Sequence, residues 1–276
     1  MERGFKETLE SQIKVTLAGA TGWAGSAVAK AIPQTSDLEL VSGISRKNAG
    51  QTLSEALPGV SCPAPLYATV EEALEHPCDV FFEYTKPEAA KHHVLIALER
   101  NCHVVVGTSG LTNTDYEEID RAAKKANRGV LAVGNFALTM VLLQKFAEIA
   151  AKYISNWEIL EYAHDDKVDA PGGTVRELAY RLSQVSTPTI TVPLKNFHGP
   201  VESRGATLSG SQVHSIRLPG YVYSVETIFG MAGETLRIRH DSGLTADPYV
   251  PGALLAIRTV HTFTGLRRGL DSVMKI

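Results

Sequence analysis

The sequence of 276 residues predicts an α/β protein with two domains, and three observations support this prediction. In the first half, short apolar segments alternate with helix-like segments, which is the pattern of a parallel sheet covered by helices on both faces. A glycine-rich turn joins the first strand-like segment to the first helix-like segment. In the second half, three strand-like segments follow one another directly. This indicates antiparallel or mixed pairing in a second, smaller sheet.

The elements expected in the first half follow from apolar patterns in chain order. Residues 13–18 are a short apolar run, and residues 103–106 read His-Val-Val-Val; both are typical of buried parallel strands. Pro87 opens a helix, a position at which proline is tolerated. Strands are expected at 13–18, 38–44, 79–82, 103–106 and 130–133, and helices at 24–32, 70–74, 87–100 and 114–126.

The second half begins with a long helix over residues 137–154. Its apolar residues predict one buried stripe, formed by Leu138, Val141, Leu142, Phe146 and Ile149. The last segment, residues 251–266, is helical in pattern, and pattern alone assigns it to neither domain. Strands are expected at 157–162, 211–218, 221–229 and 235–240, with a helix at 174–186 and turns at Pro219-Gly220 and Ala232-Gly233.

The composition excludes several classes of protein. Hydrophobic residues make up 44% and charged residues 21% of the chain, as in ordinary globular domains, and the net charge of −3 offers no basic face for nucleic acid. The cysteines Cys62, Cys78 and Cys102 are odd in number and lack CxxC spacing, so we expect no disulfide framework and a reducing cytoplasm. Met1–Gln12 lacks the apolar core of a secretory signal, and no apolar run of about 18 residues predicts a membrane span.

The glycine-rich turn predicts a dinucleotide site. Glycines allow a tight turn and a close approach of backbone N–H groups to a pyrophosphate, and the N-terminus of the following helix attracts the same anion. The spacing G-x-x-G-x-x-G is less specific than G-x-G-x-x-G, and a plain strand-turn-helix with glycines for packing is the alternative. The turn consists of Gly19, Ala20, Thr21, Gly22, Trp23, Ala24 and Gly25.

The end of the second strand indicates which nicotinamide cofactor binds. An acidic residue that binds the ribose of NAD is expected about 20 residues after the last glycine, and this position is Ser45. Arg46 and Lys47 follow it, and no carboxylate is present in this run. Two cations favour the 2′-phosphate of NADPH, with NADH as the other cofactor to consider; a solvated basic loop is the alternative interpretation.

A second motif, residues 161–174, leaves one strand and ends at a helix. Lys167 places a cation on the turn, and Gly172, Gly173 and Thr174 open the helix, whose N–H groups form an anion site. Together they predict a site for a substrate carboxylate. The alternative is an ordinary polar loop with Thr174 as the helix N-cap.

These motifs, in this order, resemble the dihydrodipicolinate reductase (4-hydroxy-tetrahydrodipicolinate reductase) family of bacterial lysine and diaminopimelate biosynthesis. The resemblance covers nearly the whole chain. The family pattern H-H-x-x-K-x-D-A-P-S-G-T, which follows a glutamate in the preceding strand, is matched at His164, Lys167, Asp169, Ala170, Pro171, Gly173 and Thr174, with Glu161 as the glutamate. Further matches are residues 84–87 to the F-T-x-P part of D-F-T-x-P, 107–110 to G-T-T-G and 133–136 to A-x-N-F, with residues 213–220 and 229–234 similar to strands of the family's second domain.

The resemblance implies a domain organisation and a reaction. Residues 1–137 are implied to form a Rossmann-type dinucleotide domain completed by the C-terminal helix within 247–276. Residues 138–246 are implied to form a substrate-binding domain, whose open mixed sheet assembles a homotetramer. The implied reaction is hydride transfer from NAD(P)H to the ring of a small anionic, cyclic carboxylated substrate, with a protein acid protonating the enamine-like carbon that develops.

The resemblance also assigns residues to these roles. His164 and Lys167 are implied to be catalytic, and His164, Gly173, Thr174 and Ser109 to bind substrate. The implied cofactor-binding residues are Gly19, Ala20, Thr21, Gly22, Trp23, Ala24, Gly25, Ser45, Arg46, Lys47, Tyr84, Thr85, Gly107, Thr108, Ser109, Val133, Asn135 and Phe136.

The chain departs from the family pattern near the expected substrate. The first of the family's two adjacent histidines, the implied proton donor, is Ala163 here, and the Ser before Gly-Thr is Gly172. Tyr223 and Val225 stand where small and His residues are common. His164, Tyr162, Asp165 or water remain as sources of the proton. A reductase of the same fold with another imine or amino-acid substrate, or a non-catalytic dinucleotide-binding protein, are the alternative functions.

Several other polar or bulky residues are interpreted as structural. His164, Asp165, Asp166 and Asp169 lie along one loop without a second histidine at a supporting spacing, so no metal site is expected. The adjacent residues His92 and His93 are expected on the surface. Cys102 and Trp157 are expected in the core.

Overall fold

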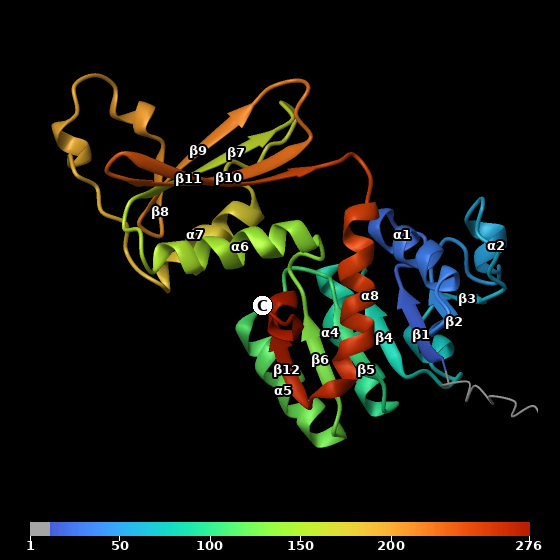
Figure 1. Cartoon of the computed structure of the whole chain (residues 1–276). Helices are drawn as coiled ribbons and strands as arrows, with labels where there is room; N and C mark the ends of the chain where they lie inside the picture. The colour runs from blue at the N-terminus through green and yellow to red at the C-terminus, as the bar shows by residue number, and fades with distance from the viewer. Residues whose placement is uncertain (1–11) are drawn as a thin grey trace, which may run out of the picture. The chain divides into compact units, whose positions relative to one another are not determined.

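The computed structural model describes residues 12–276 (Figure 1). They form two compact units: the residues up to Phe136 together with Tyr249–Ile276, and Ala137–Pro248. The expectation that Met1–Gln12 is no secretory signal lies, apart from Gln12, outside the described residues. Within the described part of the chain, no helix has the length and apolar character needed to cross a membrane.

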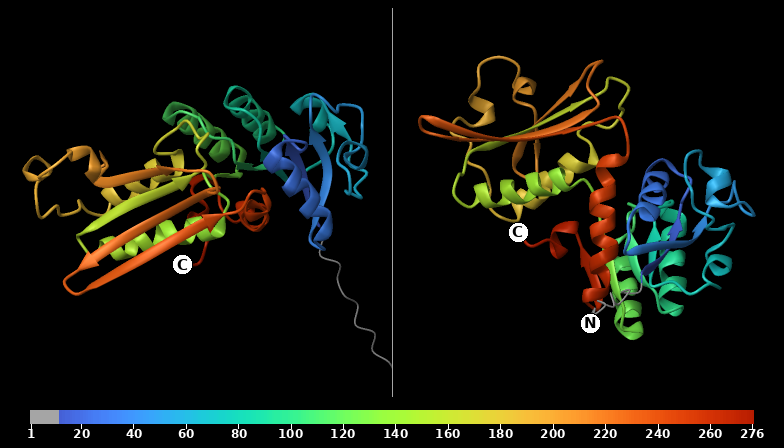
Figure 2. Two further views of the ribbon diagram at one scale, coloured as in Figure 1. Left: turned by 90° about the horizontal axis from the view of Figure 1, so that it is seen from above. Right: turned by 45° about the vertical axis from the view of Figure 1, so that its right-hand side comes forward.

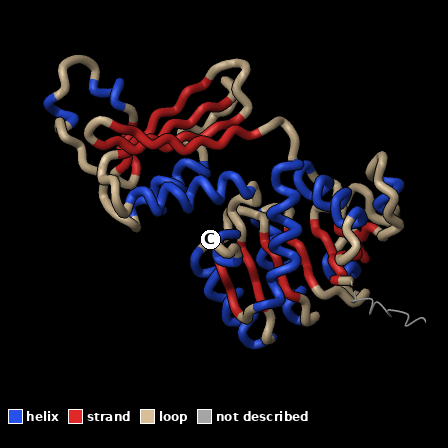
Figure 3. Tube along the Cα trace, viewed as in Figure 1, coloured by secondary structure: helices blue, strands red, loops and turns tan. Residues whose placement is uncertain are grey.

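The first unit contains a seven-stranded sheet in which all neighbouring strands are parallel. Its central strands are short apolar runs with almost no exposed side chains, because helices cover both faces of the sheet (Figure 3). This confirms the predicted α/β class. The strands, in spatial order, are β12 (Gly265–Arg268), β6 (Gly129–Ala132), β5 (His103–Val106), β4 (Val80–Glu83), β1 (Ile13–Ala18), β2 (Leu38–Ile44) and β3 (Leu66–Tyr67).

The helices of this unit begin at recognisable N-terminal signals. Before one of them, the Thr112 hydroxyl accepts a hydrogen bond from the Asp115 N–H, and the Asp115 carboxylate accepts one from the Thr112 N–H, which forms a capping box. Another starts with Pro87 in its first turn, as expected. The helices are α1 (Trp23–Ala31), α2 (Leu53–Ala56), α3 (Val70–Ala73), α4 (Pro87–Glu99), α5 (Asn113–Ala126) and α8 (Val250–Thr259).

The second unit contains a five-stranded mixed sheet in the order β11-β10-β7-β9-β8. Only the β7–β9 pair is parallel. Two helices, α6 (Leu138–Ala151) and α7 (Gly173–Ser183), lie on one face of this sheet (Figure 2). The strands are β7 (Trp157–Ala163), β8 (Ala206–Leu208), β9 (Ser211–Arg217), β10 (Tyr223–Met231) and β11 (Glu234–Ser242).

Strict alternation along β7 separates the two faces of this sheet. Trp157, Ile159, Glu161 and Ala163 are buried beneath the helices, while the residues between them are half-buried on the opposite face. Glu161 is therefore a carboxylate in the covered face of a sheet, and its burial needs compensating partners.

The C-terminal segment differs from the sequence prediction. The expected helix over residues 251–266 ends at Thr259, and a further strand, β12, pairs in parallel with β6 at the edge of the first sheet. Gly265 opens this strand with a φ of 84°, which few other residues adopt. The Leu266 N–H donates to Asp120 Oδ1 at 2.8 Å and so fixes the start of the strand to α5.

The predicted apolar stripe on the long helix is also wrong in part. Phe146 and Ile149 are 46% and 47% exposed, whereas the buried face contains Leu143 and Ala147. Apolar residues cover most of the circumference of this helix, so apolar residues on two of its faces recur with the three- and four-residue spacing of a buried stripe. The face with the smaller side chains packs against the sheet, since alanine allows closer approach.

Candidate functional site

The first unit has a pocket of about 500 Å³ at the carboxyl ends of β1, β2 and β4, where ligands bind in open parallel sheets. Eight of the residues implied to bind the cofactor line it. These are Gly19, Thr21, Gly22, Ser45, Arg46, Lys47, Tyr84 and Thr85.

The turn between β1 and α1 has room only for glycine at two positions. Gly19 has a φ of 78°, and a Cβ there would overlap the carbonyl oxygen of Tyr84. A Cβ on Gly25 would overlap the carbonyl oxygen of Gly19. Gly22 is the N-cap of α1 and makes no side-chain cap, so the first N–H groups of this helix remain available to an anion. The close approach of backbone to ligand that a pyrophosphate requires is therefore built into this turn.

The end of β2 presents polar and cationic groups to the same pocket. The hydroxyl groups of Thr21 and Ser45 lie 2.7 Å apart, and Ser45 Oγ donates to Asn48 Oδ1 at 3.1 Å. Arg46 and Lys47 are exposed beside this pair. This hydrogen-bonded corner fixes the loop that carries both cations at the position expected for the adenosine ribose.

A buried carboxylate at the end of β4 was not among the predicted site residues. Glu83 is fully buried, and its Oε1 accepts hydrogen bonds from the Thr85 N–H at 2.9 Å and from Thr108 Oγ1 at 3.1 Å, as well as from the Thr85 hydroxyl. Its Oε2 lies 2.7 Å from Nδ1 of His93, which also lines the pocket. A charged residue directly after the apolar run Val-Phe-Phe was the sequence signal for this group.

The expectation that His92 and His93 are both surface residues is therefore half wrong. The side chain of His92 is 61% exposed, but that of His93 is 14% exposed because it turns inward to Glu83. Adjacent helical residues point in directions about 100° apart, so two neighbouring histidines rarely share an environment.

An aromatic cluster lies near the ends of β4 and β5. The rings of Phe82, Tyr84 and Phe136 have centroids 5.4–5.8 Å apart. A Cβ on Gly107 would lie 2.8 Å from Phe136 and 3.0 Å from Tyr84, so this position also requires glycine. Burial raises the pKa of Tyr84 to about 12, which keeps its hydroxyl protonated at neutral pH.

Some implied cofactor residues lie outside the pocket lining. Trp23 is 63% exposed and packs edge-to-face against Tyr249, with ring centroids 5.8 Å apart. Ala20, Gly25, Thr108, Val133 and Phe136 are buried, and Ser109 is exposed. The remaining residues, Ala24, Gly107 and Asn135, are half-buried.

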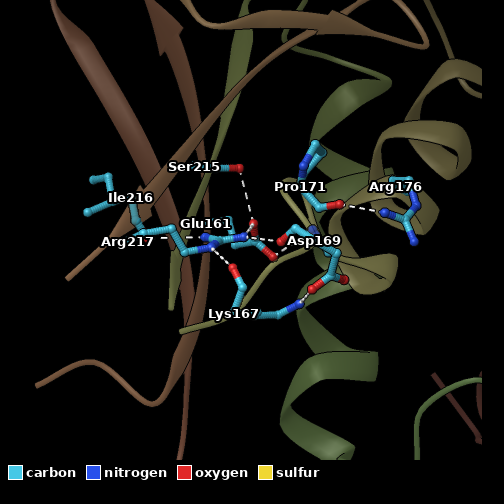
Figure 4. A network of polar contacts seen from close by, with 9 residues as sticks. Glu161, Lys167, Asp169, Pro171, Arg176, Ser215, Ile216 and Arg217 are labelled. Carbon is cyan, nitrogen blue, oxygen red and sulfur yellow. Dashed lines mark hydrogen bonds and ion pairs between the residues drawn. The ribbon is translucent and has the colours of Figure 1, made fainter. Parts of the chain in front are cut away.

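The second unit contains the motif of residues 161–174, held by a buried ion pair (Figure 4). Glu161 accepts hydrogen bonds from the Gly172 N–H at 2.9 Å, from Arg217 Nη2 at 2.7 Å and from Ser215 Oγ at 3.1 Å. These three donors satisfy the fully buried carboxylate. These hydrogen bonds thus hold the motif loop against β7 and β9.

Arg217 extends this network to the loop that carries Lys167. Its Nε donates to the Lys167 carbonyl oxygen at 3.3 Å, and its Nη2 donates to the Asp169 carbonyl oxygen at 2.5 Å. Sequence reasoning missed Arg217, which lies 50 residues after Lys167 and reaches it only because β9 pairs with β7. The guanidinium positions the loop through its backbone carbonyl groups and does not contact the lysine side chain.

Lys167 lies close to the N-terminus of α7, as the spacing of the two in the sequence suggested. Lys167 Nζ pairs with the carboxylate of Asp169, and a hydrogen bond from Lys167 lowers the pKa of Asp169. A Cβ on Gly172 would lie 2.6 Å from Glu161 Oε1 and 3.0 Å from Lys167 Nζ. Glycine at the family's serine position therefore lets the lysine approach the start of α7.

The start of α7 also decides between two interpretations of Thr174. The helix begins at Gly173 with Gly172 as its N-cap, and the cap makes no side-chain hydrogen bond. Thr174 is thus the second helical residue and not the N-cap. The first N–H groups of an eleven-residue helix lie next to the lysine loop, an arrangement that attracts a carboxylate.

The histidine of the motif has acidic neighbours. His164 Nδ1 lies 2.9 Å from carboxylate oxygens of both Asp165 and Asp166, and its side chain is half exposed. Ala163, at the position of the family's first histidine, is fully buried. Among residues 12–276, no group of three or more His, Cys, Asp or Glu side chains has the arrangement of a metal site.

Comparison with known proteins identifies relatives along nearly the whole chain. Residues 13–136 match the family described as dihydrodipicolinate reductase, N-terminus, and residues 139–274 match dihydrodipicolinate reductase, C-terminus. The chain is 36% identical to a 4-hydroxy-tetrahydrodipicolinate reductase of Halalkalibacterium halodurans, with 95% of this chain and 100% of that protein covered. It is 37% identical to the protein of that name from Geobacillus kaustophilus, with 95% and 99% covered.

The fold has a solved counterpart as well. The structure of a dipicolinate-bound dihydrodipicolinate reductase from Paenisporosarcina sp. TG-14 superimposes with a TM-score of 0.86 at 29% sequence identity. The superposition covers 95% of this chain and 100% of that one.

Proposed function

The chain belongs to the dihydrodipicolinate reductase family and is an NAD(P)H-dependent oxidoreductase, and from this premise we propose that it reduces the cyclic dicarboxylate after which its relatives are named, with NADPH as the preferred reductant. The observation that carries the proposal is the anion site of the second unit. There, the buried Glu161–Arg217 pair holds the Lys167 loop beside the N-terminus of α7.

The pocket of the first unit fits a nicotinamide dinucleotide. Side chains at Gly19 and Gly25 would overlap backbone atoms, so the turn keeps the narrow profile that a pyrophosphate needs. The preference for NADPH is supported by Arg46 and Lys47, whose charges suit a 2′-phosphate. The bound cofactor supplies hydride to the substrate.

The residues of the motif bind and orient the substrate. Lys167 and the first N–H groups of α7 bind one carboxylate, with Gly173 and Thr174 at the helix start and His164 assisting from the end of β7. A small residue at Gly172 brings the ammonium close to the helix. In the first unit, Ser109 also binds the substrate, and the residues implied to bind the cofactor hold the dinucleotide.

The function is tested by NADPH oxidation with the purified full chain and substrate generated in place by its synthase. Rapid oxidation that depends on the synthase supports the proposal, and a higher kcat/KM with NADPH than with NADH supports the cofactor preference. Tight NADPH binding without oxidation would contradict the proposed substrate and leave the cofactor site intact.

A second candidate function is favoured by Ala163. An alanine cannot donate a proton, and losing a general acid typically lowers the rate by roughly 10²–10⁴. The alanine at this position therefore also fits an enzyme that reduces a different imine or amino-acid precursor. A panel of small cyclic imine carboxylates in the same assay separates the two, because the second function predicts faster oxidation with another member of the panel.

Assembly and location follow from the family relationship. We propose a homotetramer that forms through the face of the five-stranded sheet opposite α6 and α7, and a cytoplasmic location. This face carries charged residues such as Glu226, whose carboxylate accepts from Tyr162 Oη at 3.0 Å. Light scattering of the purified chain tests the stoichiometry.

A further inference from the structure

The alanine that replaces the family's histidine has a tyrosine opposite it. In the antiparallel β7–β10 pair, Ala163 is the direct partner of Tyr223. Directly opposed residues point to the same face with Cβ atoms roughly 4.5–5.5 Å apart. Tyr223 therefore shares the covered face of the sheet with Glu161 and stands over the space that a longer side chain at position 163 would fill.

The surroundings of Tyr223 belong to the anion site. Lys167 Nζ lies 5.9 Å from the centre of the tyrosine ring. The hydroxyl is shielded from solvent and makes no hydrogen bond of normal geometry to any of the residues 12–276, although the side chains of Glu161 and Thr174 lie near it. A buried polar atom without a partner is costly, so a ligand that supplies the partner is expected to bind there.

We propose that Tyr223 is the proton donor of the reaction and takes over the role of the histidine that Ala163 lacks. This inference rests on the proposed function of the same site. The family resemblance implies a small residue at position 223 and a histidine at position 163, whereas here position 223 is a tyrosine and position 163 an alanine, and the two are direct partners across the strands.

The proton transfer balances as follows. Hydride addition to a ring carbon gives the conjugated system an electron pair, and the neighbouring carbon uses it to form a C–H bond with the phenolic proton. The O–H bond of Tyr223 breaks, and its electrons stay on the oxygen of a ring whose centre lies 5.9 Å from the Lys167 ammonium. Water then returns a proton to the phenolate.

The other groups named from the sequence are less suited to this role. Tyr162 points to the opposite face of the sheet, where its hydroxyl donates to Glu226. His164 and Asp165 contact each other beyond the end of β7 at half-exposed or exposed positions. Only Tyr223, among these candidates, shares the face of Ala163.

The raised pKa of Tyr223 is consistent with a donor that stays protonated until the reaction. Burial raises its pKa, and the carboxylate of Glu161 raises it further. The charged groups that face it are Glu161, Lys167 and Asp169. The neutral phenol is therefore the resting form throughout the physiological range.

The test is the Tyr223→Phe variant of the full chain in the NADPH oxidation assay. We expect kcat to fall by at least about 100-fold, within the range for loss of a general acid, while KM and the NADPH dissociation constant change less than about threefold. Tyr221→Phe is the matched control, since its ring packs against Tyr162 outside the site. It is expected to retain wild-type kcat.

A swap variant provides a readout that a structural role would not give. Tyr223→Gly combined with Ala163→His restores the family arrangement, so we expect it to recover at least tenfold over Tyr223→Phe. Its kcat should decline, relative to wild type, as the pH rises through the usual histidine pKa of about 6.5, since an imidazolium must be protonated to donate.

Each outcome decides one of the two proposals. Wild-type turnover with an unchanged kcat in Tyr223→Phe overturns the proton donor and leaves the proposed function standing. A wild type that binds NADPH but does not oxidise it overturns the proposed function, and the role of Tyr223 with it. A fall in kcat for Tyr223→Phe with no recovery in a folded, NADPH-binding swap variant also overturns the donor role and makes Tyr223 a positioning residue.

Discussion

Replacing Glu161 by alanine tests whether the buried ion pair organises the anion site. Glu161 is fully buried and accepts from Gly172, Arg217 and Ser215. Its removal leaves the Gly172 N–H and part of the guanidinium without a partner. Breaking a buried pair in this way costs about 3–5 kcal/mol.

The structure favours the lower end of that range. Arg217 keeps the carbonyl oxygens of Lys167 and Asp169 as partners, so its charge is not left without any compensation. We expect a loss of about 3 kcal/mol in the free energy of unfolding, a factor of roughly 10² in the folding equilibrium. Replacing both partners, Glu161→Leu with Arg217→Met, is expected to cost much less, since no buried charge remains.

The assay is urea unfolding followed by the fluorescence of Trp157, which is buried in β7. The chain has only one other tryptophan, Trp23, so a Trp23→Phe background makes the signal specific for the second unit. The midpoint should shift at constant slope. Glu158→Ala is the matched control on the same strand: Glu158 is 33% exposed, and its loss should cost no more than about 1 kcal/mol.

Two results would refute this reasoning. One is a loss below about 1 kcal/mol for Glu161→Ala. The other is a double variant that is as unstable as the single one, which would show that the instability does not come from an unpaired buried charge.

Three further predictions concern other parts of the molecule. Lys167→Ala should raise the KM for substrate or lower kcat far more than it weakens NADPH binding by calorimetry; an equal loss of both would make Lys167 structural. Arg46→Asp should shift the ratio of kcat/KM values toward NADH, and an unchanged ratio would mean that the 2′-phosphate is bound elsewhere. The hydrogen bond from Arg258 lowers the pKa of Asp37 below its usual 3.8, so this pair stabilises the first unit above that pH and loses its effect as the pH falls through the lowered pKa. Asp37→Asn should thus reduce thermal stability at pH 7, and the difference from wild type should vanish in acid; a difference independent of pH would contradict the assignment.

The parallel sheet could be predicted because its strands are buried on both faces. In β5, residues 104–106 are buried valines, and such an apolar run leaves a local signal. The edge strand β12 left none. Its sequence, Gly-Leu-Arg-Arg, has one apolar side chain, and pairing with β6 makes it a strand.

The buried face of α6 shows a different limit. Phe146 and Leu143 are both apolar and lie on different faces of the helix, and periodicity cannot rank two faces that both have the right spacing. The choice depends on which face fits closely against the sheet, and this is a property of the partner surface.

The candidate site also contains a part that local sequence predicts and a part that depends on tertiary structure. Lys167 and the start of α7 are close in sequence, so one motif contained both. Arg217 and Tyr223 reach the site only through the pairing of β9 and β10 with β7, and Glu83 meets His93 only after α4 packs on the sheet. Local patterns identified the cation and the helix, while the groups that position them depend on strand register.

Deuterium transfer from reduced nicotinamide to the product tests the central claim most directly. The purified chain is supplied with NADPH deuterated at the transferable position of the nicotinamide and with substrate made in place by its synthase, and the product is analysed by mass spectrometry. The proposal predicts a cyclic dicarboxylate that is reduced by two electrons and carries one deuterium at a ring carbon. Unlabelled or unreduced substrate recovered from a chain that binds NADPH tightly would contradict it.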